Sequence, residues 1–211
     1  MAGWLRRLAG FDMRVFEEVR SNPNATIPGV TIVILSTLIA GFGGWLWWLL
    51  EDFGNNGDIL VHSTLIGSLI AVVLWGLAWL GIVYVMLTQI FRERAYVEQL
   101  LRVMGLAAAP LCLMGLMFIP GISFGIGLTS LGLTLGLTNI AIQYVTTASP
   151  GRVLMSNLAG FFVWCSVLTL LAGGSVRSVE PHAPGVFLFN STTALAADVV
   201  DTGRQVEELI L

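Results

Sequence analysis

The sequence is poor in charged residues and contains no lysine. Charged residues make up 11% of the 211 positions, and the 10 basic residues are all arginines. In soluble proteins roughly a quarter of the residues are charged, and nucleic-acid binding needs a cationic surface that neutralises phosphates. Because the formal net charge is -3, no such excess of positive charge exists, and DNA and RNA are excluded as partners.

Residues that hold metals or carry redox chemistry are scarce as well. The two cysteines, Cys112 and Cys165, lie inside apolar runs, where a thiol usually behaves as a small hydrophobe. His62 and His182 stand alone, with no second ligand at the spacing of a zinc site. We therefore expect no metal and no cofactor, whereas a bound lipid is compatible with this composition.

Long apolar runs dominate what is present. Hydrophobic residues make up 56% of the chain, and its mean hydropathy is +0.86. A helix needs about 20 apolar residues to cross a bilayer, and five runs approach or exceed that length: residues 29–50, 65–90, 103–119, 121–142 and 153–171. They predict an all-α membrane protein, a bundle of about five transmembrane helices over residues 29–171, preceded by a segment of residues 1–28 and followed by a tail of residues 172–211.

Arginine positions predict the orientation of this bundle, because basic residues in short loops stay on the cytoplasmic side. Arginines occur before the first run and in the second and fourth connections, whereas the first and third connections contain none. This alternation predicts a cytoplasmic N-terminus and an extracytoplasmic C-terminal tail, in what we expect to be a bacterial cytoplasmic membrane. Trp45, Trp47 and Trp48 end the first run, where indole rings favour the headgroup region, and are expected to anchor the outer interface.

The first 28 residues contain a helical pattern of apolar positions. At 100° per residue, one narrow stripe contains Trp4, Leu8, Phe11, Val15 and Val19. Four charged residues fall on the opposite side: Arg6, Arg14, Glu17 and Arg20. The pattern therefore predicts one amphipathic helix at the cytoplasmic surface that stops at the turn sequence from Ser21 to Pro23. Trp4 and Phe11 are its expected interface anchors.

Glycines line one face of the fourth run. Within about 60° of one another, at helical spacing, lie Gly121, Gly125, Gly132, Gly136 and Asn139. Glycines spaced four apart let helix backbones approach closely, which is how helices associate in lipid. We expect this face to pack inside the bundle, with Asn139 as an interhelical hydrogen-bond donor. An interface with a second protein and a groove for a lipid or small molecule are the alternatives.

Prolines mark two positions in and after the third run. Pro110 lies inside the run and removes a helical hydrogen bond, so we predict a helix kink near Leu106, either as a fixed bend or as a moving hinge. Between the third and fourth runs only Pro120 and Gly121 interrupt the apolar pattern, and such a pair is typical of a turn. The third and fourth helices should therefore form a tight antiparallel hairpin.

The middle of each apolar run contains no Asp, Glu, Lys, Arg or His. Proton relays, coupled transport and intramembrane hydrolysis usually depend on such groups. We therefore expect a protein that is not an enzyme, and no residue is assigned a catalytic role.

Two segments resemble the Yip1 family of small membrane proteins, in particular its bacterial-type members. In residues 16–23 an aromatic residue and two acids precede Asn22 and Pro23. The second segment leads from the second connection into the third run and contains Glu98, Gln99, Leu100, Leu101, Gly105 and Pro110. The resemblance covers residues 11–172, concerns pattern and not a catalytic signature, and implies five helices with a cytoplasmic N-terminus and an outer C-terminus.

The chain also departs from that family. Members often have Gly-Tyr where this sequence has Gly105 and Leu106, and the Asp-Leu-Tyr-Gly-Pro type motif of eukaryotic members is missing before the first run. For eukaryotic relatives the resemblance implies vesicle traffic and small GTPase binding, but these departures give no support for transferring that role. Bacterial relatives have no general biochemical function to transfer.

These features predict a non-catalytic integral membrane scaffold or an accessory subunit of a larger membrane protein complex, with membrane lipids and membrane proteins as partners. The alternative is a lipid-interacting membrane organiser of the trafficking type, which would use the N-terminal helix on the cytoplasmic leaflet. A small-molecule transporter or channel is a second alternative, and it would need a polar pathway or discontinuous helices.

Overall fold

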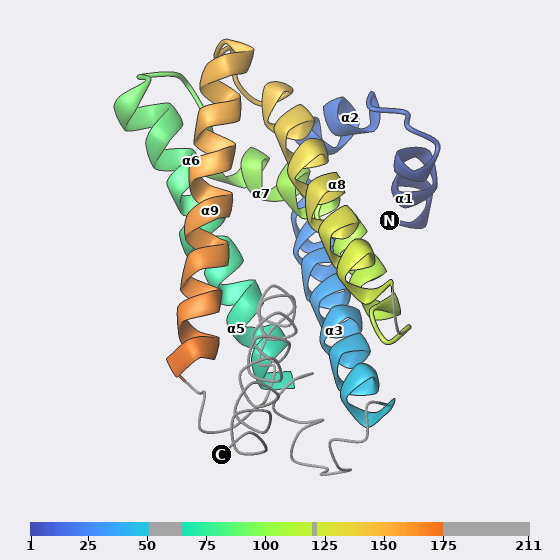
Figure 1. The fold of residues 1–211 in the computed structure, drawn as a ribbon. Coiled ribbons are helices and arrows are strands. Elements are labelled where there is room, and N and C mark those ends of the chain that lie inside the picture. The colour runs from blue at the N-terminus through green and yellow to red at the C-terminus, as the bar shows by residue number, and fades with distance from the viewer. Residues whose placement is uncertain (51–64, 120–121, 175–211) are drawn as a thin grey trace, which may run out of the picture.

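The computed structural model describes residues 1–50, 65–119 and 122–174. Within these ranges every regular element is helical and no strand occurs (Figure 1). Five helical segments are long and apolar enough to cross a membrane. The prediction of an all-α protein with five membrane-length helices is therefore confirmed.

The first two spans lie close to the first two apolar runs. The first span is α3 (Thr26–Leu50). The second span, Gly67–Ile90, alternates between α-helical and π-helical geometry in α5 (Gly67–Leu74), η3 (Trp75–Leu80), α6 (Gly81–Val85) and η4 (Met86–Ile90). The two π-helical stretches are not apparent from hydropathy, because an apolar run has the same composition in either geometry.

The other three spans also follow the predicted runs, with one change of geometry. The third span is α7 (Val97–Ala107) followed by the 3-10 helix η5 (Ala109–Leu116). The fourth is α8 (Ser123–Gln143), and the fifth is α9 (Pro150–Gly174). Pro150 begins α9, where its missing N–H would have no helical acceptor and its fixed φ suits the first turn.

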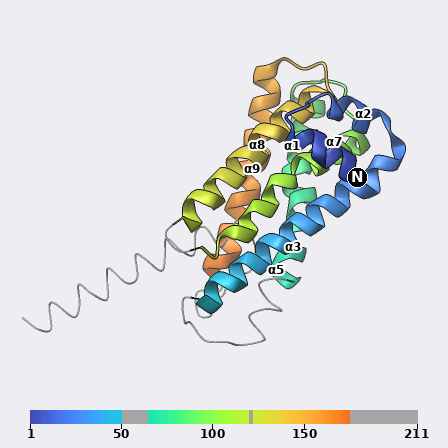
Figure 2. The same cartoon turned by 90° about the vertical axis from the view of Figure 1, so that its right-hand side faces the viewer.

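The five spans form a closed ring. α3 packs against α5 on one side and against α7 and η5 on the other. α8 packs against α7, η5 and α9, and α9 contacts the second span (Figures 1 and 2). The order around the bundle is therefore second, first, third, fourth and fifth span.

Close helix crossings depend on glycine pairs between the first and third spans. A Cβ placed on Gly105 of α7 would lie 2.7 Å from the carbonyl carbon and oxygen of Gly29 in α3. Further along, a Cβ on Gly43 would lie 2.6 Å from the Cα of Gly115 in η5. Real Cβ atoms do not approach backbone so closely, so each crossing requires glycine, and the small residues serve the close approach of backbones that lipid-embedded helices need.

Aromatic side chains fill the contact between the second and fifth spans. The ring centroids of Trp79 and Trp164 lie 5.4 Å apart, and those of Trp79 and Phe161 lie 5.0 Å apart. Trp79 and Trp164 are fully buried. Gly160 faces Trp79, because a Cβ there would lie 2.6 Å from the Trp79 carbonyl oxygen, and this glycine lets α9 approach the second span.

The N-terminal segment forms two short helices, α1 (Ala2–Ala9) and α2 (Val15–Ser21), and the prediction of one continuous helix is wrong. The chain turns at Gly10 and Phe11, and Phe11 has a φ of 57°. Glycine is a poor helix former, and the Asp12 carboxylate accepts hydrogen bonds from the Arg7 side chain (2.8 Å) and the Arg14 backbone N–H (3.2 Å). These bonds favour a turn over a continued helix.

Several predictions fall outside the described residues or on side chains that the structure does not describe. They include the acidic first connection, the turn at Pro120 and Gly121, both histidines, and nearly all of the tail after residue 171. Trp47 and Trp48 lie within α3, but only the backbone is described there. Trp45 is half-buried, and its ring lies 5.3 Å from that of Phe42.

Candidate functional site

The predicted glycine face of α8 is open. Gly125, Gly132 and Gly136 are exposed, and a Cβ added to any of them would meet no atom within 4 Å. The expectation that this face packs inside the bundle is therefore wrong for these three residues. Glycine spacing alone does not say which face of a helix turns inward, because a stripe of other small residues can pack equally well.

A stripe of hydroxyl residues forms the buried face of α8 instead. Ser130, Thr134 and Thr138 are fully buried at intervals of four residues. The Thr134 hydroxyl donates to the Ser130 carbonyl (2.8 Å), and the Thr138 hydroxyl donates to the Thr134 carbonyl (2.8 Å). Because the Thr134 and Thr138 hydroxyls donate within their own helix, these two residues pack as small residues. Their spacing of four residues was a signal that sequence reasoning missed.

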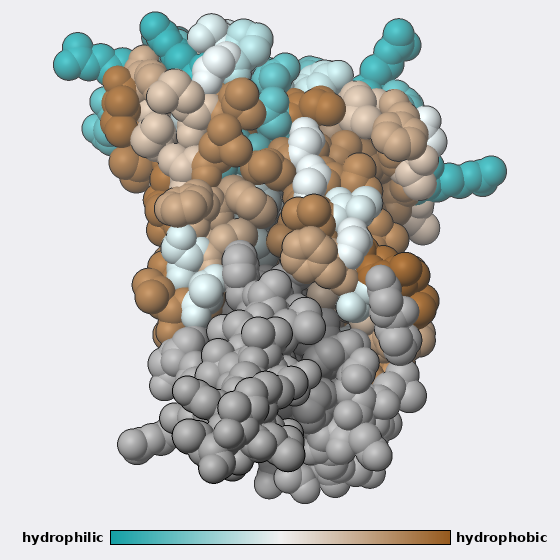
Figure 3. Space-filling view, in the orientation of Figure 1, coloured by the Kyte–Doolittle hydropathy of each residue, from teal (hydrophilic) through white to brown (hydrophobic). Residues whose placement is uncertain are grey.

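An apolar groove runs between α8 and α9. It has a volume of about 690 Å³ and is lined by Leu131, Gly132, Phe161, Phe162, Cys165 and Leu170, among others. Its surface is almost entirely carbon, and the Phe162 side chain beside it is 71% exposed. The walls of the bundle are mostly hydrophobic, and hydrophilic residues gather at the end that carries α2 (Figure 3).

A buried hydrogen-bond node joins three spans. Asn157 of α9 accepts a hydrogen bond from the Trp79 indole N–H (2.9 Å). Its amide nitrogen donates to the Leu135 carbonyl (3.0 Å) and to the Thr138 hydroxyl (3.1 Å) of α8. The second, fourth and fifth spans are thereby tied together inside the bundle, where an unpaired polar group is costly.

Asn139, the predicted interhelical donor, does not have that role among the described contacts. Its Oδ1 atom is buried without a hydrogen-bond partner. It lies on the same side of α8 as the open glycines, whereas the contact between α8 and α9 is bonded through Asn157. The sequence signal that favoured Asn139 was its alignment with the glycines, and that face is not the packing face.

Pro110 changes the geometry of the third span. α7 ends at Ala107, just beyond the predicted kink near Leu106, and the chain continues as the 3-10 helix η5 with Pro110 in its first turn. The Pro110 carbonyl accepts a hydrogen bond from the Ser130 hydroxyl of α8 (2.7 Å). The predicted interruption is thus a change from α to 3-10 geometry that is bonded to a neighbouring span.

Arginines at one end of the bundle bind other elements. The buried Arg102 side chain of α7 donates to the Thr26 hydroxyl (2.8 Å), the Arg20 carbonyl (3.2 Å) and the Glu98 carboxylate (3.1 Å). Arg20 of α2 donates to the Tyr144 carbonyl at the end of α8 (2.8 Å), where a cation also complements the helix dipole. Arg152 of α9 pairs with Glu93 at 2.8 Å. These arginines fasten the connections to the ends of the spans.

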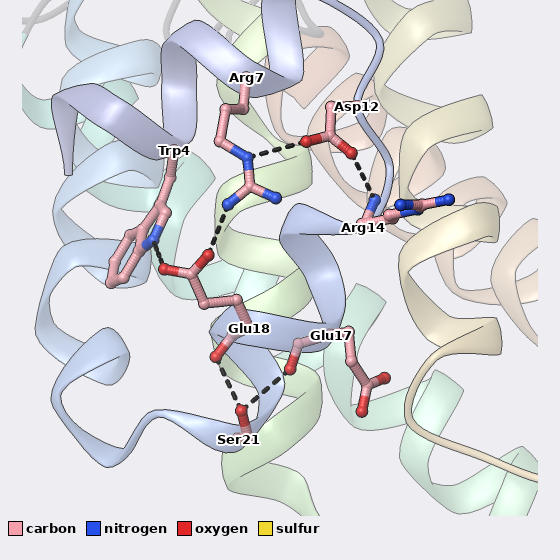
Figure 4. A network of polar contacts seen from close by, with 7 residues as sticks. All are labelled: Trp4, Arg7, Asp12, Arg14, Glu17, Glu18 and Ser21. Carbon is pink, nitrogen blue, oxygen red and sulfur yellow. Dashed lines mark hydrogen bonds and ion pairs between the residues drawn. The ribbon is translucent and has the colours of Figure 1, made fainter.

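A polar network holds α1 against α2 (Figure 4). The Trp4 indole N–H donates to the Glu18 carboxylate (2.7 Å), and the Arg7 guanidinium bonds both Glu18 and Asp12. The hydrogen bonds from Trp4 and then Arg7 hold the pKa of Glu18 below its ordinary value, and the bond from Arg7 does the same for the pKa of Asp12. Trp4 is therefore a contact between two helices and not a free anchor.

This network predicts a pH dependence for the docking of α1. Because the pKa of each carboxyl is lower in the folded than in the unfolded state, the contacts stabilise docking above the unfolded-state pKa, about 4. That contribution is lost as the pH falls through the folded-state value. A spin label at the exposed Gly3, introduced as Gly3→Cys with Cys112 and Cys165 replaced by alanine, should become more mobile below about pH 4.

Glu18→Gln is the matched control for this measurement. It keeps the shape of the side chain but removes its charge, so the label should already be mobile at neutral pH and respond less to acid. In the labelled protein with Asp12 and Glu18 intact, the label could be equally mobile at neutral and at acid pH. That result would contradict a role of these carboxylates in docking.

Among the described residues, the groups that lie close together serve the packing of helices. Within the ranges that the structure covers, no three His, Cys, Asp or Glu side chains gather where a metal could be held. Five apolar helices of membrane length fit a multi-pass membrane protein. Comparison with models of protein families, with curated proteins and with solved structures finds no match to this chain. The resemblance to the Yip1 family remains a prediction.

Proposed function

We propose that this protein is a non-catalytic scaffold or accessory subunit of a membrane protein complex, and that the exposed side of α8 together with the groove beside α9 receives a transmembrane helix of its partner. One observation carries the proposal. Gly125, Gly132 and Gly136 of α8 are open, and Gly132 lines an apolar groove of about 690 Å³. Open glycines let the backbone of another helix approach closely, which is a main source of helix association in lipid.

The neighbouring side chains support a helix as the occupant of this groove. The exposed Phe162 provides a large apolar surface at the groove, and aromatic side chains supply much of the contact area at interfaces. The hydroxyls of Ser130, Thr134 and Thr138 and the amide of Asn157 are bonded within the bundle. These polar groups stabilise the fold and are not available to a ligand, so we expect the neighbouring surface to bind its partner through close packing.

The same proposal includes an orientation and a family. Arg20, Arg102 and Arg152 lie at the end of the bundle that carries α2. Because arginines near membrane spans tend to stay on the cytoplasmic side, this placement supports a cytoplasmic N-terminus and an extracytoplasmic C-terminus. For a bacterial-type Yip1 member, the membrane would be the cytoplasmic membrane. The glycine contact between Gly29 and Gly105 involves one of the residues on which the resemblance to that family rests.

Gly132→Leu tests the proposed docking surface. The Cβ of the leucine meets no atom within 4 Å, and the rest of its side chain extends into the groove, so the variant should fold normally while losing its partner. Overpacking of a contact costs about 1–3 kcal/mol, which corresponds to a roughly 5- to 150-fold loss of association. The tagged chain is purified in mild detergent from its own cells, and the amount of each co-purified protein is measured by quantitative mass spectrometry.

Gly76→Leu is the matched control, because Gly76 lies in the second span and a Cβ there also meets nothing within 4 Å. The control should retain a stoichiometric partner that Gly132→Leu loses. Recovery of the chain alone, or only as a homo-oligomer, would overturn the accessory-subunit proposal. Equal retention by both variants would overturn the placement of the interface on α8 and α9.

A further inference from the structure

A second apolar cleft lies between the N-terminal segment and the wall of the bundle. It has a volume of about 260 Å³ and no polar lining. Its outer wall includes Leu5, Leu8 and Phe11, and its inner wall includes Pro110 and Leu113 of η5 and Leu137 of α8. Both side views place α1 next to α8 (Figures 1 and 2). The cleft is therefore a narrow apolar space between a surface helix and two membrane spans.

Phe11 stands at this cleft in an unusual conformation. It has a φ of 57° and its side chain is 75% exposed although it lines an apolar space. Non-glycine residues seldom adopt a positive φ, and such backbone is retained where surrounding contacts enforce it. Here the Phe11 N–H donates to the Leu8 carbonyl (2.9 Å) and the Asp12 N–H donates to the Arg7 carbonyl (3.0 Å). The turn thus holds an aromatic ring at the cleft.

Two arginines of the N-terminal segment, close in sequence to residues that line the cleft, have no acidic partner among the described residues. Ion pairs engage Arg7, Arg20, Arg102 and Arg152, whereas Arg6 and Arg14 are exposed and form none within the part of the chain that the structure covers. Arg6 follows Leu5 on α1, and Arg14 comes three residues after Phe11. The Arg14 side chain points away from the Arg7–Glu18 network (Figure 4). The segment therefore combines an apolar cleft with two guanidinium groups that no acid of the described residues engages.

We propose that this cleft binds one acyl chain of an anionic phospholipid, whose phosphate is held by Arg6 and Arg14. An acyl chain satisfies a lining without polar atoms, whereas an extended peptide segment would bring backbone N–H and C=O groups that find no partner there. Guanidinium groups bind phosphate through paired hydrogen bonds. Two arginines that form no ion pair within the described residues favour an anionic headgroup over a zwitterionic one. This site is separate from the groove between α8 and α9 and does not depend on the proposed function.

Native mass spectrometry of the purified full chain tests the charge requirement of the site. Phosphatidylglycerol is titrated against phosphatidylcholine, and we expect one tightly bound phosphatidylglycerol. The double variant Arg6→Gln, Arg14→Gln should lower its affinity about tenfold or more, since each arginine near anionic headgroups contributes appreciably. The matched control Arg92→Gln, Arg94→Gln changes two exposed arginines in the second connection and should leave binding unchanged. Equal affinity for both lipids, or equal loss in both double variants, would overturn the proposal.

Two further measurements test the position of the acyl chain. Phosphatidylglycerol with a photoreactive group near the end of its acyl chain should label peptides that contain residues 109–113 or 133–137 of the unsubstituted protein. Labelling of residues 161–170 alone would overturn the assignment. Glycerol phosphate without acyl chains should not displace the lipid, and displacement would show that the apolar cleft does not contribute. Because the label is applied to the unsubstituted protein, the result does not depend on any variant folding.

Discussion

Replacing Gly105 by alanine is expected to lower the free energy of unfolding of the bundle by about 2 kcal/mol. The added Cβ would lie 2.7 Å from two backbone atoms of Gly29. Backbone cannot rotate out of the way as a side chain can, so the first and third spans must separate. Because the same helices meet again where Gly43 faces Gly115, the shift would disturb a second close crossing. Unfolding of the purified protein in mixed micelles, followed by circular dichroism as the fraction of dodecyl sulfate rises, measures the change.

Gly132→Ala is the matched control for this prediction. A Cβ at Gly132 meets nothing within 4 Å, and alanine is a better helix former than glycine by up to about 1 kcal/mol. The control should therefore be neutral or slightly stabilising. A larger loss of stability in Gly132→Ala than in Gly105→Ala would mean that the open face of α8, and not the crossing of α3 and α7, carries the helix contacts.

The spans themselves were predictable because lipid cannot hydrogen-bond a bare peptide group, so an apolar run of sufficient length must be helical. Hydropathy accordingly placed all five, including α9 despite Ser156 and Asn157 near its start. Both residues are buried and hydrogen-bonded. The Ser156 hydroxyl donates to the Arg152 carbonyl (2.9 Å), and Asn157 bonds Trp79 and α8 as described above. Polarity at a span terminus was therefore a packing signal and not a sign that the span was absent.

The inward face of α8 was not predictable from the glycines, because glycine is equally compatible with a close crossing and with an open surface. Packing is decided by the partner helix, and the glycine spacing of α8 does not tell which face that helix covers. Gly29, Gly105 and Gly160, which do make close crossings, occur in the sequence without the paired spacing that drew attention to α8. Three-dimensional contacts were needed to tell the two groups apart.

The break in the N-terminal helix was missed for a different reason. The stripe from Trp4 to Val19 fits a helix of uninterrupted geometry, but Gly10 weakens that helix and Asp12 offers bonds that stabilise a turn. Local bonds of this kind compete with helical periodicity. As a result, Val15 and Val19 form part of the buried face of α2, while Phe11 is exposed beside the cleft.

Replacing Asn157 by leucine should also destabilise the bundle by about 2 kcal/mol. The substitution removes three hydrogen bonds, each worth about 0.6 kcal/mol on average between membrane helices, and leaves the buried Trp79 indole N–H without its acceptor. Leucine has a similar volume, so the loss reports on bonding and not on a cavity. The same dodecyl sulfate titration measures the effect, and the near-ultraviolet circular dichroism of Trp79 and Trp164 should weaken, because their fixed packing depends on this node.

Asn139→Leu provides the comparison that separates this node from the general cost of removing an asparagine from a span. The Asn139 Oδ1 atom is buried and unpartnered, and removing an unsatisfied acceptor is close to neutral or stabilising. The two variants make the same chemical change, one on each of two packed helices, α8 and α9. If Asn139→Leu destabilised the protein as much as Asn157→Leu, the polar contact among the second, fourth and fifth spans would not be centred on Asn157. If Asn157→Leu lowers the stability and Asn139→Leu does not, the polar contact among these spans is centred on Asn157 of α9. That result agrees with the proposal that the exposed side of α8 binds another helix.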